Sequence, residues 1–511
     1  MRSKWKSALA GGGLGMVAAL APAPDAAASH QVPGFEADAS RLVGAITTKG
    51  VVAHMNELQW IADYRNGNRA ASTSGYAASV SYVRRKLEAA GYRTSTRSFD
   101  YPYFKEIGTP VLRAGGTGYT AETDFLTMEL SGSGSASGRL VAIDVQIPPP
   151  ATGSSTSGCE ASDFPPAGAT PAIAVVQRGT CDFAVKVANA AAAGYRGVVI
   201  FNEGQEDRTD LFGGTLGSPG ALPAVSTSYA IGQQLVDLAE AGGTGQLEVR
   251  ARSETRQTYN IVAETAGGRA DRVVMVGAHL DSVPEGPGIN DNGSGSAAIL
   301  ELALQMAKLK VQPKNKVRFG WWGAEEYGLH GSNAYVAGLP DEQAASILAY
   351  LNFDMIASHN YAWLIQQGNP DSAADKVVEQ VFTKYFQRAR LPYQYSPADG
   401  RSDYAAFSAI GIPVGGLFSG ADAIKTEKQA RLFGGVAGQP LDPCYHKACD
   451  TNRYISRRST LVLSRAIADT VYKFAMTERD IRQENIQAAQ ARVMSAQAGE
   501  EARYQGPHLV R

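Results

Sequence analysis

Cysteine is scarce in this chain, with four residues among 511. So few cysteines exclude a small scaffold held together by disulfides, although they allow one or two bridges. Neither sign of charge is in excess, because 48 Lys and Arg stand against 49 Asp and Glu. Binding to nucleic acid or to an anionic membrane surface needs a basic surplus, so the composition argues against both.

Long apolar runs are also missing. Beyond the N-terminal segment the sequence has no run of 18 apolar residues that could cross a bilayer. Wholesale disorder is excluded as well, because 44% of the residues are hydrophobic and 19% are charged. At about 100–200 residues per domain, the length predicts two to four domains.

The N-terminus has the pattern of an export signal. Three basic residues precede a short apolar stretch over residues 8–21, and Ala26–Ala28 follows as a small-residue cleavage site. We expect a signal peptide over residues 1–28 and a secreted, extracellular protein without a membrane anchor after cleavage. An uncleaved anchor is the alternative, although the apolar stretch is too short to span a bilayer. In an oxidising compartment the four cysteines are expected to pair.

The first half of the chain mixes periodic segments with turn-rich ones. Residues 131–170 are rich in Gly, Ser and Pro, which predicts loops or the joints of an insertion. Apolar periodicity on both sides predicts helices and strands. The expected helices and strands are residues 51–64 (helix), 76–87 (helix), 94–103 (strand), 173–176 (strand), 184–193 (helix) and 197–201 (strand).

The second half alternates apolar strands with amphipathic helices. Strands are expected at 273–277, 317–322 and 347–353, and helices at 296–309 and 374–389. Strands that are apolar throughout favour a largely parallel sheet that is covered on both faces. The fold class expected is therefore α/β, with a mixed, mostly parallel sheet between helices and a small inserted α/β domain.

The domain limits follow from these changes in composition. We expect a discontinuous large domain over residues 36–130 and 251–480, and a small inserted domain over residues 131–250. A C-terminal tail over residues 481–511, rich in Gln, Ala, Arg and Glu, is expected to be a polar helix or a frayed end. No function is assigned to this tail.

Histidine and carboxylate side chains follow the strands of the second half. The carboxyl ends of parallel strands share one edge of a sheet, which is where active sites of such folds lie. Nitrogen and oxygen ligands in this number suit zinc and suffice for two ions, and so many buried carboxylates would repel one another without cations. The candidate residues are His279, Asp281, Asp291, Glu325, Glu326, Asp354 and His446.

Each of these residues alone has an ordinary structural interpretation. A single His is more often a hydrogen-bonded core residue, and Asp354 alone could cap a helix. Their common position at strand ends is what favours a metal site.

The motifs around these residues resemble peptidase family M28, a family of zinc aminopeptidases with a phosphorylase/hydrolase-like fold. They occur in the family's order, and residues 178–183 and 193–202 also resemble a protease-associated (PA) domain. The resemblance implies a secreted enzyme of bacterial type with two zinc ions and an inserted PA domain. The matching motifs are H-x-D at 279–281, G-x-N-D-N-G-S-G at 288–295, A-E-E at 324–326, N-F-D-M at 352–355, G-R-S-D at 400–403 and C-Y-H at 444–446.

The resemblance also implies a division of the metal ligands. Asp291 would bridge the two zinc ions, with His279 and Asp354 completing one site and Glu326 and His446 the other. Two such ions can share one water and lower its pKa toward neutrality.

Catalytic roles are implied in the same way. Glu325 would be the general base that takes a proton from this water. Tyr445 would donate its hydroxyl to the oxyanion, and Asp281 would accept the ring N–H of His279 or orient that ring. Arg401 would lie near the substrate backbone. The substrates expected are peptides or proteins with a free N-terminus, whose ammonium the carboxylates attract, with a preference for Leu-like hydrophobic N-terminal residues.

Two structural expectations accompany the resemblance. A Cys444–Cys449 bridge would stiffen the loop that carries His446, as in some secreted members, which leaves Cys159–Cys181 for the PA-like domain. The four cysteines allow three connectivities, and this one is chosen on proximity in the sequence and in the domain. A separate set of aromatic residues could either line a hydrophobic substrate pocket or belong to the core: Trp321, Trp322, Tyr327 and Phe418.

Three other functions are compatible with this fold. A glutaminyl cyclase-like transferase would use one zinc ion, whereas the five ligands favour two. A metallo-carboxypeptidase would need basic groups for a free α-carboxylate, and Arg401 is the only candidate. A catalytically inactive PA/peptidase-like binding protein would have lost its ligands, whereas all of them are present.

Overall fold

The computed structural model describes residues 31–151 and 154–482. The expected signal peptide at 1–28 and nearly all of the expected tail at 481–511 lie outside these residues. Within the described part, no helix is both long and apolar enough to cross a membrane.

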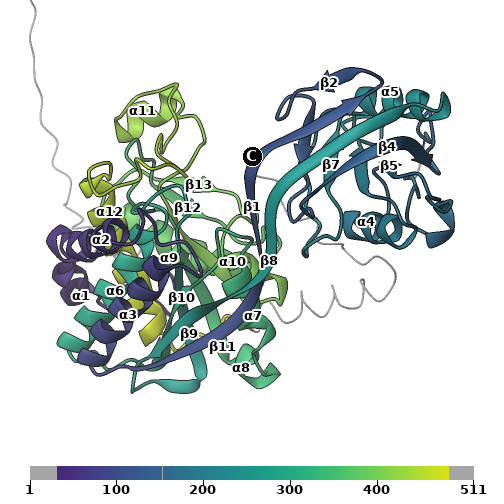
Figure 1. Cartoon of the computed structure of the whole chain (residues 1–511). Coiled ribbons are helices and arrows are strands. Elements are labelled where there is room, and N and C mark those ends of the chain that lie inside the picture. The colour runs from purple at the N-terminus through teal and green to yellow at the C-terminus, as the bar shows by residue number, and fades with distance from the viewer. Residues whose placement is uncertain (1–30, 152–153, 483–511) are drawn as a thin grey trace, which may run out of the picture.

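The larger of two lobes is built around a mixed, mostly parallel sheet (Figure 1). Its centre consists of β9 (Arg269–His279), flanked in parallel by β10 (Asn315–Trp322) and β11 (Ile347–Phe353). The strand β14 (Val414–Phe418) continues the parallel arrangement beside β11. Antiparallel neighbours close both sides, namely β8 (Thr244–Glu264) beside β10 and β12 (Leu364–Gln366) beside β14, with β13 (Gln394–Ser396) at the edge. The expected fold class is confirmed.

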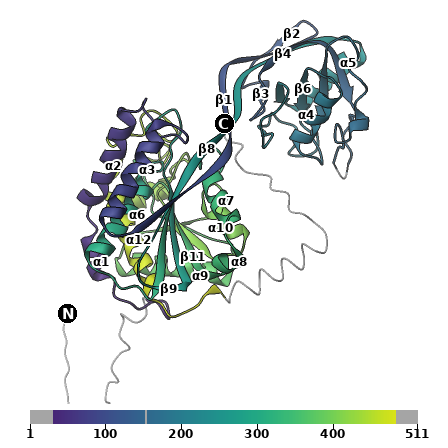
Figure 2. The same ribbon diagram turned by 60° about the horizontal axis from the view of Figure 1, so that its bottom comes forward.

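Helices cover both faces of this sheet (Figure 2). The apolar residues of the longer helices share one core with β9, β10 and β11. The opposite face packs on α7 (His330–Ala337) and α10 (Tyr404–Ala409), and α8 (Asp341–Ser346) precedes β11. The helices of the first face are α1 (Ser40–Ala45), α2 (Thr48–Asp63), α3 (Ser74–Ala89), α6 (Gly293–Lys308), α9 (Ala373–Arg388) and α12 (Arg457–Met476), and the short α11 (Glu427–Phe433) lies in a loop.

The two neighbouring tryptophans at the end of β10 belong to opposite faces of the sheet. Trp321 and Trp322 are fully buried, the first in the core under the long helices and the second in the core under α7 and α10. Tyr327 is partly buried against the rings of Tyr101 and Tyr103, and Phe418 packs on the main core. The tryptophans are therefore core residues and do not line a substrate pocket.

The smaller lobe is an α/β unit on a long two-stranded arm (Figures 1 and 2). The arm consists of β1 (Arg93–Ala114) and β8, which pair in antiparallel fashion along their length. In the lobe, β4 (Gly134–Ile143), β5 (Ala172–Gln177), β6 (Gly197–Phe201) and β7 (Ala224–Thr227) lie side by side. The remaining elements are β2 (Thr117–Tyr119), β3 (Phe125–Thr127), η2 (Ala161–Asp163), α4 (Phe183–Ala192) and α5 (Tyr229–Glu240).

The cores of the small lobe include residues that precede position 131. Leu112 and Phe125 pack with the strands of the lobe, and Met128 and Leu130 pack on its other face.

Most of the expected helices and strands are present, but the expectation for residues 131–170 is wrong in part. Residues 134–143 form β4, which pairs with both β5 and β8. A Cβ atom at Gly138 would lie 1.9 Å from the carbonyl oxygen of Pro171. Gly138 thus reflects close packing of the backbone within a strand. The rest of the described segment, after residue 143, is mostly loop as expected.

Candidate metal centre

Parallel strands bring the candidate residues to one edge of the large sheet. His279 is the last residue of β9, Glu325 and Glu326 follow β10, and Asp354 follows β11. Backbone at these points is unusual, because Ala324, Met355 and His446 all have positive φ angles of 51–58°. Non-glycine residues avoid this region unless the surrounding structure imposes it, and such residues often lie at functional sites.

Asp291 lies between the two histidines. Its Oδ1 is 3.2 Å from Nε2 of His279, and its Oδ2 is 3.2 Å from Nε2 of His446. His279 Nε2 is also 3.3 Å from Oδ1 of Asp354, and His446 Nε2 is 3.0 Å from Oε2 of Glu326. The carboxylate of Asp291 thus belongs to two groups of side chains at once, with one oxygen in each.

The residues present fit a metal. In two overlapping groups, His279–Glu325–Asp354 and His279–Asp291–Glu326, the potential ligand atoms lie within 4.8 Å of one another. Both ring nitrogens of His279, Oε1 of Glu326 and Oδ1 of Asp354 are buried without a hydrogen-bond partner in the described structure. Buried polar atoms are normally hydrogen-bonded, so these atoms lack the partners that a cation would provide. Imidazole nitrogens and carboxylate oxygens are the ligands that suit zinc.

The burial of several carboxylates at one place also favours the binding of cations. Burial raises the pKa of the Glu325 carboxyl well above its usual value and that of Glu326 to about 7. Burial lowers the pKa of His446, but the neighbouring Glu326 and Asp291 outweigh it and raise that pKa to about 11. Without cations, these glutamate and histidine side chains would therefore bind extra protons. Bound cations would take the place of those protons.

Glu325, which belongs to the first group, and Asp281 both lie near His279. Oε2 of Glu325 is 3.9 Å from Nε2 of His279, and the side chain is 9% exposed. Oδ1 of Asp281 is 3.5 Å from Nδ1 of His279, and its two oxygens accept the backbone N–H groups of Glu325 and Glu326 at 3.3 and 3.4 Å. Asp281 therefore also fixes the turn that presents both glutamates.

Tyr445 and Arg401 lie on the more exposed side. The ring of Tyr445 stacks on that of His446, with centroids 3.8 Å apart. Nη2 of Arg401 donates a hydrogen bond to the Tyr445 hydroxyl at 3.3 Å, and its Nη1 is 3.6 Å from Oδ1 of Asp422. All the expected site residues are thus brought to one place.

Sequence reasoning missed several residues that hold the candidate ligands. Ser402 donates to Oδ2 of Asp354 at 2.7 Å, and its place in the G-R-S-D motif could have indicated this. Asp450 accepts the backbone N–H groups of Asn290 and Asp291 at 2.7 and 3.0 Å. Arg69 donates to the carbonyls of Leu280 and Gly288 at the two ends of the loop before Asp291, and no pattern in the sequence signalled it.

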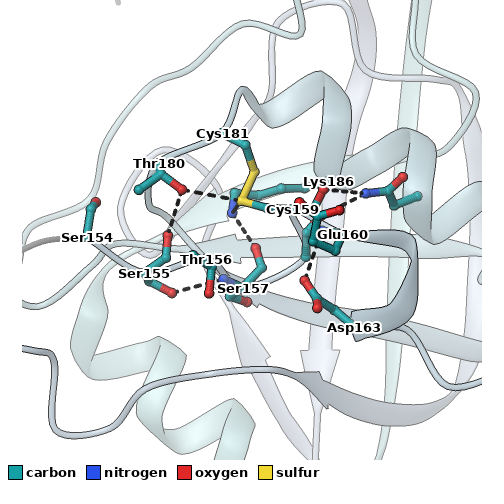
Figure 3. Close-up of a disulfide and its surroundings, with 12 residues drawn as sticks. Ser154, Ser155, Thr156, Ser157, Cys159, Glu160, Asp163, Thr180, Cys181 and Lys186 are labelled. Atoms are coloured by element: carbon teal, nitrogen blue, oxygen red, sulfur yellow. Dashed lines mark hydrogen bonds between the residues drawn. A yellow bond between two sulfur atoms is a disulfide. The ribbon is translucent and has the colours of Figure 1, made fainter. Parts of the chain in front are cut away.

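Both expected disulfides are present. Cys444–Cys449 closes the loop of Tyr445 and His446. Cys159–Cys181 joins the segment before η2 to the turn before α4 in the small lobe (Figure 3). Lys186 lies beside this second bridge, where its ammonium donates to the carbonyl of Ser157.

Fold and site together define the class of two-lobed α/β proteins with a candidate metal centre at the carboxyl edge of the large sheet. The model of peptidase family M28 matches residues 260–471, and that of the PA domain matches residues 136–235. The chain belongs to peptidase family M28, a family of hydrolases, and carries an inserted PA domain, as the resemblance implied.

The relatives agree with this assignment. An aminopeptidase of Pseudomonas aeruginosa is 44% identical over 83% of this chain and 80% of its own length. A probable leucine aminopeptidase of Aspergillus fumigatus is 37% identical over 85% of each chain. Among solved structures, an aminopeptidase from Aneurinibacillus sp. strain AM-1 aligns over 87% of this chain and 97% of its own, with a TM-score of 0.64. Its 24% identity shows a shared fold.

Proposed function

We propose that the protein is a secreted di-zinc aminopeptidase that removes N-terminal residues, preferably hydrophobic ones, from peptides. The observation that carries the proposal is the position of Asp291, whose two carboxylate oxygens each face a different histidine, 3.2 Å away in both cases. A carboxylate placed in this way is suited to bridge two cations.

The proposed ligands form two sets that share Asp291. His279 and Asp354 would complete one zinc site, and Glu326 and His446 the other. Zinc bound there would supply Lewis acidity toward a substrate carbonyl and lower the pKa of a nearby water. The zinc aminopeptidase of Bacillus subtilis shares the fold, with a TM-score of 0.56 at 21% identity, which supports zinc as the metal.

Glu325 is the proposed general base. Its Oε2 lies 3.9 Å from Nε2 of His279, farther than the Asp291 and Asp354 oxygens at 3.2 and 3.3 Å. It would take the proton of the attacking water and return it to the leaving amine. Asp281 supports this role because it holds the backbone of Glu325 in place.

Tyr445 is the proposed oxyanion donor. Its hydroxyl is held by Arg401 and its ring by His446, so it would donate to the developing oxyanion from a fixed position. Arg401 would act at the substrate backbone and through Tyr445.

Removal of the N-terminal residue fits the charge of the site better than removal of the C-terminal one. The buried carboxylates would attract a free α-ammonium. The nearby cation Arg401 is already faced by Asp422 and engaged with Tyr445, which disfavours a binding site for a free α-carboxylate. Relatives named leucine aminopeptidases, at 34–37% identity, support a preference for hydrophobic N-terminal residues.

Export and domain limits complete the proposal. The signal-like N-terminus, the two disulfides and a related probable lipoprotein aminopeptidase of Mycobacterium tuberculosis support a location outside the cytoplasm. From the sequence, the proposed peptidase domain comprises residues 36–130 and 251–480, and the small inserted domain begins at residue 131. The packing in the cores of the small lobe favours an earlier start of the inserted domain, at about residue 108, where the pairing of β1 with β8 shifts register.

The first experiment combines metal content with substrate chemistry. Purified mature protein would be analysed for zinc and assayed on Leu-p-nitroanilide and on its N-acetylated form. Near two zinc ions per chain, with hydrolysis of the free amine only, is the expected result. About one zinc ion without anilide hydrolysis would indicate a cyclase-like enzyme, and absence of zinc would indicate a binding protein. Release of the C-terminal residue from an N-acetylated peptide, assayed alongside, would indicate a carboxypeptidase.

Glu325→Gln tests the base. The variant should keep both zinc ions and lose activity by about 10²–10⁴-fold, because the carbonyl of Gln cannot take up the proton. The control is Glu203→Gln, which changes a buried carboxylate of the small lobe and should leave kcat unchanged. A Glu325→Gln variant with normal kcat contradicts the assignment.

A further inference from the structure

Arg69 is a fully buried arginine in the loop between α2 and α3. In the described structure its guanidinium donates only to backbone carbonyls. Nε donates to Pro287 at 2.9 Å, Nη2 to Gly288 at 2.5 Å, and Nη1 to Leu280. A buried charge is costly unless it is well paired, so the absence of a carboxylate among these hydrogen-bond acceptors requires a reason.

The three carbonyls lie at the two ends of one loop. Leu280 directly follows His279, and Gly288 comes three residues before Asp291. The loop is tightly folded, because a Cβ atom at Gly288 would lie 2.3 Å from the carbonyl oxygen of Asp291. The backbone N–H of Arg69 adds a hydrogen bond to Ser282 at 2.9 Å. A single side chain therefore sets the separation between the two segments that carry His279 and Asp291.

The charge of Arg69 acts on the same site. Burial lowers the pKa of its guanidinium, but Asp281, Asp450, Asp291 and Glu326 oppose this, so that the pKa falls only to about 10. The group is thus a cation at neutral pH. Its N–H groups donate to neutral backbone carbonyls. The positive charge of Arg69 therefore balances negative charge on the carboxylates without a hydrogen bond to any of their oxygens.

We propose that Arg69 is a positioning residue of the metal centre, which fixes the spacing between His279 and Asp291 and balances the charge of the acidic cluster while leaving the carboxylate oxygens free for metal. The inference rests on the proposed function in taking His279 and Asp291 as metal ligands. This geometry needs a planar guanidinium group, which holds several N–H donors in fixed directions. Lysine could therefore replace the positive charge of Arg69 but not its arrangement of donors.

The variants are Arg69→Lys and Arg69→Ala, with Arg272→Lys and Arg272→Ala as matched controls. Arg272 is also buried and donates to Asn315 at 2.8 Å and to the carbonyl of Arg479 at 2.8 Å, but it lies near the start of β9, away from the carboxyl edge of the sheet. Loss of either arginine should lower the melting temperature, so stability alone does not distinguish them.

The distinguishing readouts are zinc affinity and chemical rescue. Zinc affinity would be measured by competition with a chromogenic chelator, and should fall by about 10–100-fold in Arg69→Ala and less in Arg69→Lys. Added guanidinium ion, but not urea at the same concentration, should restore part of the zinc affinity of Arg69→Ala. The Arg272 variants should keep wild-type zinc affinity and show no rescue.

The outcomes separate this inference from the proposed function. Wild-type protein with two zinc ions, together with Arg69 variants of unchanged zinc affinity, overturns the role of Arg69 and leaves the aminopeptidase proposal intact. An equal loss of zinc affinity in the Arg272 variants also overturns it, because the effect would then follow from general destabilisation. Wild-type protein that binds no zinc overturns both. If Arg69→Ala does not fold, Arg69→Lys decides on the same zinc measurement.

Discussion

Replacing Gly295 with alanine should impair the metal centre although the residue is not itself one of the proposed ligands. Gly295 lies in the first turn of α6, where its N–H donates to the side chain of Asn292 at 2.9 Å. The same Asn292 side chain donates to the carbonyl of Phe353 at 3.0 Å and accepts from the N–H of Met355 at 3.2 Å. The start of α6, next to Asp291, is thus tied to the end of β11, next to Asp354.

The size of the effect follows from the distances. A Cβ atom at Gly295 would lie 2.0 Å from the carbonyl oxygen of Phe353 and 2.5 Å from Oδ1 of Asn292. Ordinary contact begins at 3.4 Å, so α6 and β11 would have to separate by more than 1 Å. Such overpacking costs about 1–3 kcal/mol of stability. A misplacement of about 1 Å between Asp291 and Asp354 should lower kcat/KM by about 100-fold.

The assay compares Gly295→Ala with Gly44→Ala. A Cβ atom at Gly44, in α1, meets nothing within 4 Å, and alanine favours the helix there by up to about 1 kcal/mol. Gly44→Ala should therefore keep full activity and an equal or higher melting temperature. Gly295→Ala should lose zinc affinity, kcat/KM and thermal stability together. A Gly295→Ala variant with unchanged zinc affinity and kcat/KM would refute the reasoning.

Three further predictions concern other parts of the molecule. Tyr445→Phe should keep its zinc and its KM but lose about 10²–10³-fold in kcat, measured on Leu-p-nitroanilide; an unchanged kcat removes Tyr445 from the oxyanion role. Replacing Cys444 and Cys449 with serine opens a short loop, so unfolding should become easier by only about 2 kcal/mol while zinc affinity at His446 falls; intact affinity contradicts the stiffening role. Burial lowers the pKa of Lys186 to about 8 from 10.5, so the unfolded chain binds more protons and wild-type stability rises between about pH 8 and 10.5. The melting temperature of Lys186→Met should not rise over this pH range. A pH profile identical to that of the wild type would contradict the lowered pKa of Lys186.

The candidate ligands could be predicted because β9, β10 and β11 are separated by helices along the chain. That pattern implies a parallel sheet, and the residues after successive parallel strands necessarily share an edge. His279, Glu326 and Asp354 could therefore be placed together before the structure was known. Residues held by long-range backbone contacts had no such signal, as Arg69 and Asp450 show. Their partners lie more than 150 residues away in the sequence.

Composition misled in one segment for a physical reason. The Gly and Ser residues at 131–138 have the composition of a linker, yet Gly134–Ile143 is a strand between β5 and β8. Glycine is required at position 138 because the backbone of Pro171 approaches too closely for a side chain, which local sequence does not reveal.

The alternation of apolar segments was enough to predict the fold class, and the positions of the four cysteines were enough to predict both disulfides. The ligand roles came from the resemblance of short motifs. Three features became visible only in the folded chain, namely which oxygen of Asp291 faces which histidine, the core position of Trp321 and Trp322, and the contacts of Arg69 with the loop between His279 and Asp291. The physical reason is that ligand types and periodicity are local properties of the chain. Distances between segments are set by packing and by hydrogen bonds between residues that are remote in the sequence.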